Sequence, residues 1–217
     1  VNLKEIQEKC KVSSVLINSK GKVISKEVSC IQIDAGDSVT LEQQLAIQKP
    51  ELWSIEDPYL YTLQTTLRTG KEIFDVFQTS VGIRTFRFTA DSGFFLNGKH
   101  IKLKGTNNHH DGGPLGAACM DYTFARQLRI LKEVGSNALR MSHNPPAPEF
   151  LNCADRMGFV VIDEIFDEWL SGKMPFGYSE HFLTWSEMDV ENWIRRDRNH
   201  PSVIAWSLGN EIPEQKS

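Results

Sequence analysis

The stretch NALRMSHNPPAPEFLNCADRMGFVVID, residues 137–163, has the residue pattern of a strand, a helix and a second strand. Residues 137–141 predict a short strand. Pro148 then opens a segment whose apolar residues recur with helical spacing, and Gly158 is expected to end that helix. The apolar run at 159–163 is typical of a strand that a parallel sheet buries on both faces. The stretch therefore indicates two parallel strands joined by a crossover helix.

The same alternation continues on both sides of this unit, after a hairpin turn predicted at Asn97 and Gly98. Strands are expected at residues 101–105, 137–141, 159–163 and 203–208. Helices are expected to begin at a cap on Asp121, at Pro148, and at a capping box of Thr184 and Glu187. A (β/α)8 barrel has eight strands and eight helices over about 250 residues. Residues 86–217 therefore predict the first half of a TIM barrel, ending after its fourth strand.

Residues 1–85 follow a different pattern. β-Branched and other apolar side chains recur at every second position around Val15, Val39 and Leu63, as in strands. Turn-forming sequences separate these segments at residues 18–22, 34–37 and 69–71. Short strands with this spacing predict an immunoglobulin-like β-sandwich, and a small β-barrel would give a similar pattern. We therefore expect two domains, 1–85 and 86–217.

The composition argues against several classes of partner. The chain has 24 Lys and Arg against 28 Asp and Glu, a net charge of −4, and both signs are scattered, which disfavours binding to nucleic acid or to an anionic membrane. No apolar run approaches the roughly 20 residues that span a bilayer, and the first residues lack a secretory signal pattern. The widely spaced Cys10, Cys30, Cys119 and Cys153 indicate neither a disulfide framework nor a zinc site.

Polar side chains follow each predicted strand of the second domain, where βα folds collect their catalytic residues. They are Asn107, Asn108, His109, His110 and Asp111 after the first strand, Arg140, Ser142, His143 and Asn144 after the second, Asp163, Glu164, Asp167 and Glu168 after the third, and Asn210 and Glu211 after the fourth.

Three chemistries can be weighed for this set. A zinc site is disfavoured because His109 and His110 are adjacent and no HExxH helix is present. A serine nucleophile is disfavoured because Ser142 lacks the GxSxG context. Asn210 and Glu211 fit glycoside hydrolysis, in which a carboxylic acid protonates the leaving oxygen and an amide can bind a sugar hydroxyl. The same pair could also cap a helix after the strand.

Longer stretches resemble glycoside hydrolase family 2, which contains β-galactosidases, β-glucuronidases and β-mannosidases. They are RDRNHPSVIAWSLGNE at 196–211, LRMSHNPPAPEFLNCADRMGFVVIDE at 139–164, FFLNGKHIKLKGTNNHHD at 94–111, PELWSIEDPYLYTL at 50–63 and VGIRTF at 81–86. The resemblance covers essentially the whole chain in family order. It implies an interior piece of a longer enzyme, with the central sandwich domain followed by half of the catalytic barrel.

The resemblance also implies an activity, namely hydrolysis of terminal β-glycosidic bonds by a retaining double displacement. The FDEW run at 166–169 resembles the β-galactosidase branch more than the β-glucuronidase branch, so β-D-galactosides are the expected substrates. The alternatives are β-glucuronidase or β-mannosidase specificity, or a non-catalytic carbohydrate-binding module. Glu211 matches the general acid/base, and Asn210 the amide that binds the sugar 2-hydroxyl. The nucleophile Glu is expected on a seventh strand, so residues 1–217 alone are expected to be inactive.

Four further positions match substrate-binding residues of the family. His143 and His109 match the histidines that line the sugar pocket, while Arg140 and Asp163 match rim positions and could instead form a structural bridge. Some members hold magnesium with a Glu and a His two residues apart, but here Leu170 follows Glu168 at that spacing. No metal or other cofactor is therefore expected. The expected partner is a carbohydrate; a homo-oligomer is compatible with the sequence, which leaves the compartment open.

Overall fold

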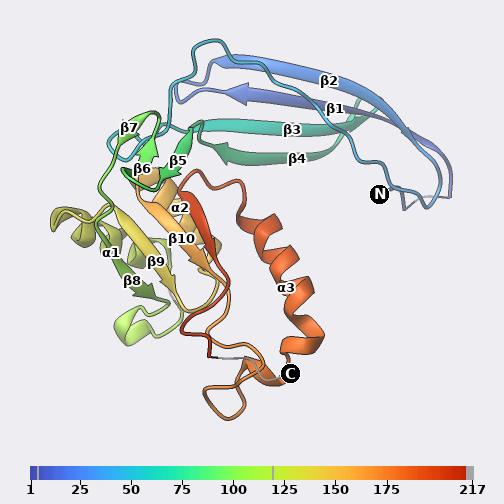
Figure 1. The fold of residues 1–217 in the computed structure, drawn as a ribbon. Helices are drawn as coiled ribbons and strands as arrows, with labels where there is room; N and C mark the ends of the chain where they lie inside the picture. The colour runs from blue at the N-terminus through green and yellow to red at the C-terminus, as the bar shows by residue number, and fades with distance from the viewer. Residues whose placement is uncertain (4, 119, 214–217) are drawn as a thin grey trace. The chain divides into compact units, whose positions relative to one another are not determined.

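The computed structural model describes residues 1–3, 5–118 and 120–213, which form two compact units (Figure 1). One unit comprises Val1–Glu51 and Tyr59–Val81, and the other comprises Leu52–Pro58 and Gly82–Ser217. The division after Val81 lies near the predicted domain border at residue 85. The segment Leu52–Pro58, however, belongs to the second unit although it lies within the first in sequence.

The first unit contains a four-stranded antiparallel sheet with the order β2-β1-β3-β4. Its strands are β1 (Glu8–Ile17), β2 (Val23–Ile33), β3 (Tyr61–Thr69) and β4 (Glu72–Val81). Two of the predicted turns connect hairpins, and in each a glycine takes a positive φ, 77° at Gly21 and 59° at Gly70. The strands predicted around Val15 and Leu63 and the turns predicted at residues 18–22 and 69–71 are confirmed.

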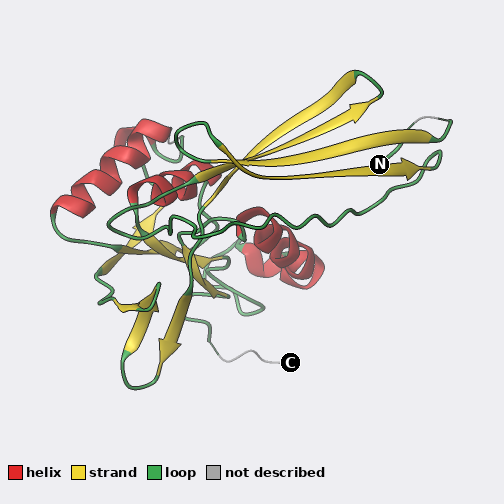
Figure 2. Ribbon diagram, turned by 90° about the horizontal axis from the view of Figure 1, so that it is seen from above, coloured by secondary structure: helices red, strands yellow, loops and turns green. Residues whose placement is uncertain are grey.

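The segment after β2 differs from its prediction. Around Val39 the chain is extended, but within the described residues it joins no strand ladder, and Figure 2 shows it as a long loop. Alternate residues from Leu41 are half-buried, and the Gln43 side chain bonds to Ser14 Oγ at 2.6 Å and to Ser29 Oγ at 3.0 Å. An alternation of apolar and polar residues reflects alternating burial. An extended segment that lies on a sheet has this alternation just as a strand does.

The second unit contains a parallel sheet with the order β11-β10-β9-β8, in which each strand pairs with its neighbour in sequence. The strands are β8 (Gly105–His109), β9 (Ala138–Ser142), β10 (Val160–Glu164) and β11 (Val203–Ser207). The helices between them are α1 (Asp121–Glu133), α2 (Pro148–Met157) and α3 (Phe182–Asp197), with short 3-10 turns η1 (Gly113–Leu115) and η2 (Tyr178–Glu180). The predicted half barrel of four strands and three crossover helices is confirmed (Figure 1).

Two boundaries in this unit were predicted wrongly. β8 begins at Gly105, where the predicted strand was expected to end. α3 begins at Phe182, so that Thr184 lies inside the helix, and its N-cap residue His181 makes no side-chain capping bond. Capping patterns can occur inside a helix by chance, because they depend on only two residues.

A small antiparallel sheet precedes the barrel strands in the chain. It consists of β5 (Phe86–Thr89), β6 (Gly93–Leu96) and β7 (Lys99–His100). Asn97 and Gly98 form its second turn with φ of 50° and 78°, as predicted. Asn97 also donates to the Trp53 carbonyl at 2.9 Å, which ties the Leu52–Pro58 segment to this hairpin.

The core of the second unit lies between the sheet and the helices α1 and α2. Trp53 is fully buried and donates its indole N–H to the Asp155 carbonyl on α2 at 2.8 Å. Gly158 ends α2, as predicted, in the left-handed conformation, and a Cβ there would clash with the Ile55 carbonyl oxygen. Glycine is thus required both by the turn and by the close approach of the Leu52–Pro58 segment.

Among the described residues, no helix is long and apolar enough to cross a membrane. Cys10, Cys30 and Cys153 are free thiols, and Cys119 lies outside the described residues.

Candidate active site

Strand register determines which side chains face the inside of the half barrel. Arg140 pairs with Asn107 on one side and with Ile162 on the other. Glu164, two residues after Ile162, pairs with Ser207. Paired residues and residues two apart point to the same face of a sheet, so these side chains share the inner face.

Glu164 is the centre of this inner cluster and is fully buried. Its Oε2 accepts from Arg140, with Nη2 at 2.7 Å and Nε at 3.0 Å, and from Ser207 Oγ at 2.6 Å. Its Oε1 lies 2.7 Å from His143 Nδ1. Since an ionised carboxylate only accepts hydrogen bonds, this contact assigns the proton to Nδ1 of His143. One carboxylate therefore orients three side chains from the ends of two strands, β9 and β11.

The two histidines singled out from the sequence lie together. The rings of His109, at the end of β8, and His143, just after β9, have centroids 5.2 Å apart and are perpendicular. The contact between His143 Nδ1 and the buried Glu164 carboxylate determines the orientation of the His143 ring.

Asn210 is held on every side at the end of the fourth barrel strand. Its backbone N–H donates to the Phe166 carbonyl at 3.0 Å, and its side-chain Nδ2 donates to Asp167 Oδ1 at 2.9 Å. Its Oδ1 accepts from Arg140 Nη2 at 3.1 Å, and its carbonyl accepts from Lys173 Nζ at 2.7 Å. All four polar groups of this residue are therefore hydrogen-bonded, and only 8% of its surface is exposed.

Glu211 follows directly and has a solvent-exposed side chain. Its φ of 46° lies in the left-handed region, which residues other than glycine rarely adopt. Such a conformation costs about 1–3 kcal/mol and persists where the surrounding structure imposes it. The four bonds of Asn210 supply that constraint on one side of Glu211.

Asp163 requires a correction. It pairs in register with Trp206, whose ring packs 4.7 Å from that of Trp193 on α3, so this pair faces the helices and not the barrel interior. Asp163 is fully buried, and neither carboxylate oxygen has a hydrogen-bond partner among the described residues. The alternative of a structural bridge between Arg140 and Asp163 is also wrong, because Arg140 forms its ion pair with Glu164. A side chain without solvent access on the helix side cannot contact a sugar at the rim.

The setting of Asp163 favours its neutral form. Burial in the protein interior, followed by the negative charge of Asp197, raises the pKa of Asp163 to about 7. The carboxyl group of Asp163 therefore titrates near neutral pH in the folded state, while an unfolded Asp titrates near pH 3.9.

We expect Asp163→Asn to stabilise the full-length protein at alkaline pH. Between about pH 4 and pH 7 the folded state binds the extra proton, so the stability contributed by Asp163 is fully present below pH 4 and is lost as the pH rises to 7. An amide removes this titration, so the variant should match the wild type at pH 4 and exceed it at pH 8 by at least about 1 kcal/mol. Denaturant midpoints across this range measure the difference.

The matched control is Asp121→Asn, which removes an exposed carboxylate on α1 and should leave the pH dependence unchanged. A stability difference for Asp163→Asn that is constant from pH 4 to pH 8 would contradict the assigned titration.

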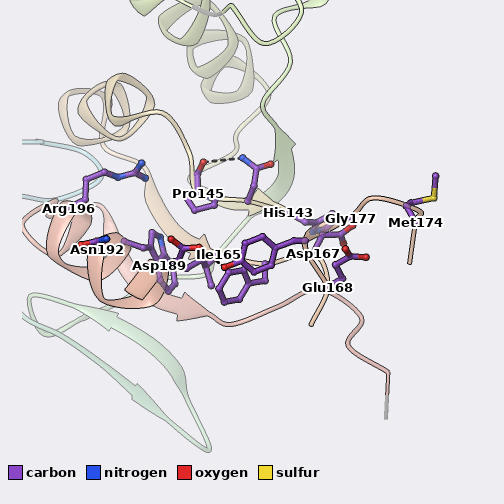
Figure 3. A pocket seen from close by; sticks show the side chains of 14 residues that line it. His143, Pro145, Ile165, Asp167, Glu168, Met174, Gly177, Asp189, Asn192 and Arg196 are labelled. Carbon is purple, nitrogen blue, oxygen red and sulfur yellow. Dashed lines mark hydrogen bonds between the residues drawn. The ribbon is translucent and has the colours of Figure 1, made fainter. Parts of the chain in front are cut away.

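A pocket of about 550 Å³ adjoins the cluster, between the loops after β9 and β10 and the side of α3. Figure 3 shows His143, Asp167 and Glu168 towards one end of the pocket and Asn192 and Arg196 at the other. Phe166 and Tyr178 contribute a stacked aromatic pair, with ring centroids 4.8 Å apart, to its wall. The pocket thus combines polar and aromatic surface.

Glu168 organises the loop that connects β10 to α3. Its carboxylate accepts the backbone N–H of Lys173 at 2.6 Å and of Ser179 at 2.9 Å, and these bonds lower the pKa of Glu168 below its usual value. Both oxygens are therefore used by the backbone. Together with Leu170 two positions later, this does not fit a metal site, and the described part of the chain holds no group of three potential metal ligands.

The sequence did not single out several residues that the structure adds to the site. Glu164 was recognised only as a rim position. It lies two residues after Ile162, which pairs with Arg140, so knowledge of that pairing would have placed Glu164 on the same face as Arg140. Ser207 lies inside a strand that reads as apolar. Lys173 lies in a loop and carries no sequence signal of its contact with Asn210.

Comparison with known proteins gives consistent results. The family model described as "Glycosyl hydrolases family 2, TIM barrel domain" matches residues 88–217, and that described as "Glycosyl hydrolases family 2" matches residues 1–84. A β-galactosidase of Bacteroides ovatus is 47% identical over 217 residues, which are 100% of this chain and 26% of that protein. A β-glucuronidase of Bacteroides fragilis is 34% identical over 204 residues, covering 92% of this chain and 29% of that protein.

Solved structures agree. A glycosyl hydrolase family 2 member from Bacteroides cellulosilyticus superposes with a TM-score of 0.91 at 39% identity, covering 96% of this chain and 27% of that one. A Bacteroides uniformis β-glucuronidase has a TM-score of 0.84 at 32% identity, with 97% and 25% covered. The chain thus spans about a quarter of the length of these relatives.

Proposed function

This chain belongs to glycoside hydrolase family 2, and on that premise we propose that the full-length protein hydrolyses terminal β-glycosidic bonds with Glu211 as its general acid/base. The observation that carries the proposal is the anchored turn after β11. Four hydrogen bonds hold Asn210, one of them from Arg140, and the solvent-exposed Glu211 follows it directly.

Glu211 has two tasks in the proposed reaction. As a carboxylic acid it protonates the departing glycosidic oxygen while a second carboxylate attacks the anomeric carbon. As a carboxylate it then takes a proton from the water that hydrolyses the glycosyl-enzyme. In a retaining enzyme the two carboxyl groups are about 5 Å apart. We expect the second on a later strand of the barrel.

The remaining polar side chains suit the binding of a sugar. Asn210 uses one amide hydrogen for Asp167 and one lone pair for Arg140, which leaves one of each for a sugar hydroxyl. We propose that it binds the 2-hydroxyl, and that His109 and His143 line the sugar pocket. Arg140 is proposed to act from the rim through its bonds to Glu164 and Asn210.

We propose β-D-galactosides as the substrates. The 47% identical relative from Bacteroides ovatus is a β-galactosidase, and this supports the galactoside over other sugars. A β-glucuronide is the second candidate, because β-glucuronidases are among the relatives and the similar structures. Parallel assays with aryl β-galactoside and aryl β-glucuronide separate the two.

For the first unit we propose the immunoglobulin-like sandwich domain of the family, with domain limits at 1–85 and 86–217. The proposal is supported by the four antiparallel strands and by the family match over residues 1–84. The extended segment around Gln43 covers one face of the sheet through its bonds to β1 and β2.

The stereochemistry of the product tests the proposed mechanism. With an aryl β-galactoside, or the β-glucuronide if that is the substrate, we expect the full-length protein to release the β-anomer first, because two successive displacements restore the configuration. Proton NMR during the first minutes, before mutarotation, measures it. Initial release of the α-anomer would indicate a single displacement and remove the proposal. The same substrate without protein gives the background rate.

A further inference from the structure

The loop from residue 165 to 181 reaches across the barrel rim to the turn that carries Glu211. Glu168 fixes the shape of this loop by accepting the backbone N–H groups of Lys173 and Ser179. Gly177 packs so closely against the Glu168 carboxylate that no Cβ could be accommodated there without displacing it. The backbone of Lys173 is therefore held in one place by a buried carboxylate within its own loop.

From this position Lys173 makes two contacts with its ammonium group. Nζ lies 2.9 Å from Asp167 Oδ1 and donates to the Asn210 carbonyl oxygen at 2.7 Å. The same Asp167 oxygen accepts from Asn210 Nδ2 at 2.9 Å. Asp167, Lys173 and Asn210 thus form a closed triangle of contacts. Through it the loop binds both the side chain and the main chain of Asn210.

The Asp167 carboxylate is the charged partner in this triangle. Burial alone would raise the pKa of Asp167, but the hydrogen bonds from Asn210 and Lys173 and the nearby ammonium charge together lower it below its usual value. Hydrogen bonds to ionised groups are shorter and stronger than those between neutral groups. The hydrogen bond from Asn210 Nδ2 to Asp167 is therefore charge-assisted.

The contact with the Asn210 carbonyl controls the residue after it. The Asn210 carbonyl and the Glu211 N–H belong to one planar peptide unit, so a donor that fixes the carbonyl also fixes the plane from which Glu211 extends. Glu211 has the unfavourable φ of 46°. If the plane were released, the chain could rotate towards negative φ and swing the Glu211 side chain away from its present direction.

From these contacts we propose that Lys173 and Asp167 are positioning residues for Glu211, which they hold in the direction required for proton transfer. The inference rests on the proposed function of Glu211 as general acid/base. Lys173 does not touch the reacting atoms; it acts through the peptide between Asn210 and Glu211.

The test is Lys173→Met in the full-length protein, assayed with an alkyl and a dinitrophenyl β-galactoside, or the matching β-glucuronides if that is the substrate. We expect kcat for the alkyl substrate to fall about 10- to 100-fold, part of the 10²- to 10⁴-fold that general acid catalysis supplies. The dinitrophenyl substrate needs little proton donation, so its kcat/KM, which reports the steps up to formation of the glycosyl-enzyme, should change less than about threefold. KM for the alkyl substrate should change little, whereas KM for the dinitrophenyl substrate should fall where hydrolysis of the glycosyl-enzyme, in which Glu211 is the base, limits turnover.

Three further variants sharpen the result. Asp167→Ala should reproduce the selective loss, and the double variant should lose no more than the larger single loss, because the two residues act as one unit. Lys173→Arg retains a cationic donor and should recover most of the activity towards the alkyl substrate. Lys99→Met is the matched control and should behave as the wild type. It removes an exposed ion pair between Lys99 on β7 and Glu56 in the Leu52–Pro58 segment.

The outcomes are separable. A selective loss that Lys173→Arg restores supports the inference. Wild-type kinetics in Lys173→Met, an equal loss on both substrates, or failure of Lys173→Arg to restore activity would overturn it while leaving the proposed function intact. A wild-type protein that cleaves neither β-galactosides nor β-glucuronides would overturn the proposed function, and this inference with it.

Discussion

Replacement of Glu211 by glutamine is expected to slow hydrolysis of an alkyl β-galactoside by the full-length protein by about 10²- to 10⁴-fold. Glutamine has nearly the same shape as glutamic acid but cannot donate a proton to the leaving oxygen. A dinitrophenyl leaving group departs without that proton, so its glycosylation step should slow far less. The measurement is kcat/KM for both substrates, which reports the steps up to formation of the glycosyl-enzyme.

The histidines provide the comparison for this prediction. His109 and His143 are proposed to contact the sugar and not the leaving group, so His109→Ala and His143→Ala should each lower kcat/KM for the two substrates by similar factors. Equal losses in Glu211→Gln on both leaving groups would contradict a role in proton donation. Such a result would instead indicate that Glu211 contributes only to binding.

Glu164→Ala is expected to lower the stability of the full-length protein by about 3 kcal/mol, the lower end of the range for breaking a buried ion pair by removing one partner. Arg140, His143 and Ser207 all lose the same acceptor. The lower end applies because the Arg140 side chain is 29% exposed and can be partly hydrated. Chemical denaturation at pH 7 measures the effect.

The same change should lower kcat/KM by at least about a hundredfold, since catalytic geometry is sensitive to displacements of about 1 Å and two site residues lose their orientation. Glu149→Gln, at an exposed position in the first turn of α2, is the control and should leave both properties unchanged. A Glu164→Gln variant with wild-type stability and activity would refute the central role of this carboxylate.

The local sequence of residues 86–217 was sufficient to predict the half barrel. Helical spacing of apolar residues, the apolar run that forms β10, and Gly158 after α2 each depend on neighbours within a few positions. The hairpin turn at Asn97 and Gly98 is of the same kind, because both residues tolerate positive φ. Features of this range can be derived from the residues that form them.

The errors occurred where the outcome depends on distant parts of the chain. The segment around Val39 has the alternation of a strand, but whether it pairs depends on a free sheet edge, and here it lies across the sheet instead. The start of β8 was misplaced by four residues because its position is set by pairing with β9. An alternating or apolar pattern does not identify a pairing partner.

The sequence by itself determined which residue types would gather at the rim, and through its resemblance to a family it pointed to Glu211 and Asn210. Only the tertiary structure decided which side chains meet. Asp163 and Glu164 are adjacent in a strand and must point to opposite faces of the sheet. Both faces of β10 are buried, so the apolar pattern could not show which of the two residues faces the barrel interior. Lys173 reaches Asn210 from a loop 37 positions away in the chain. Such a contact forms only when the chain folds, and no periodic pattern of residues in the sequence predicts it.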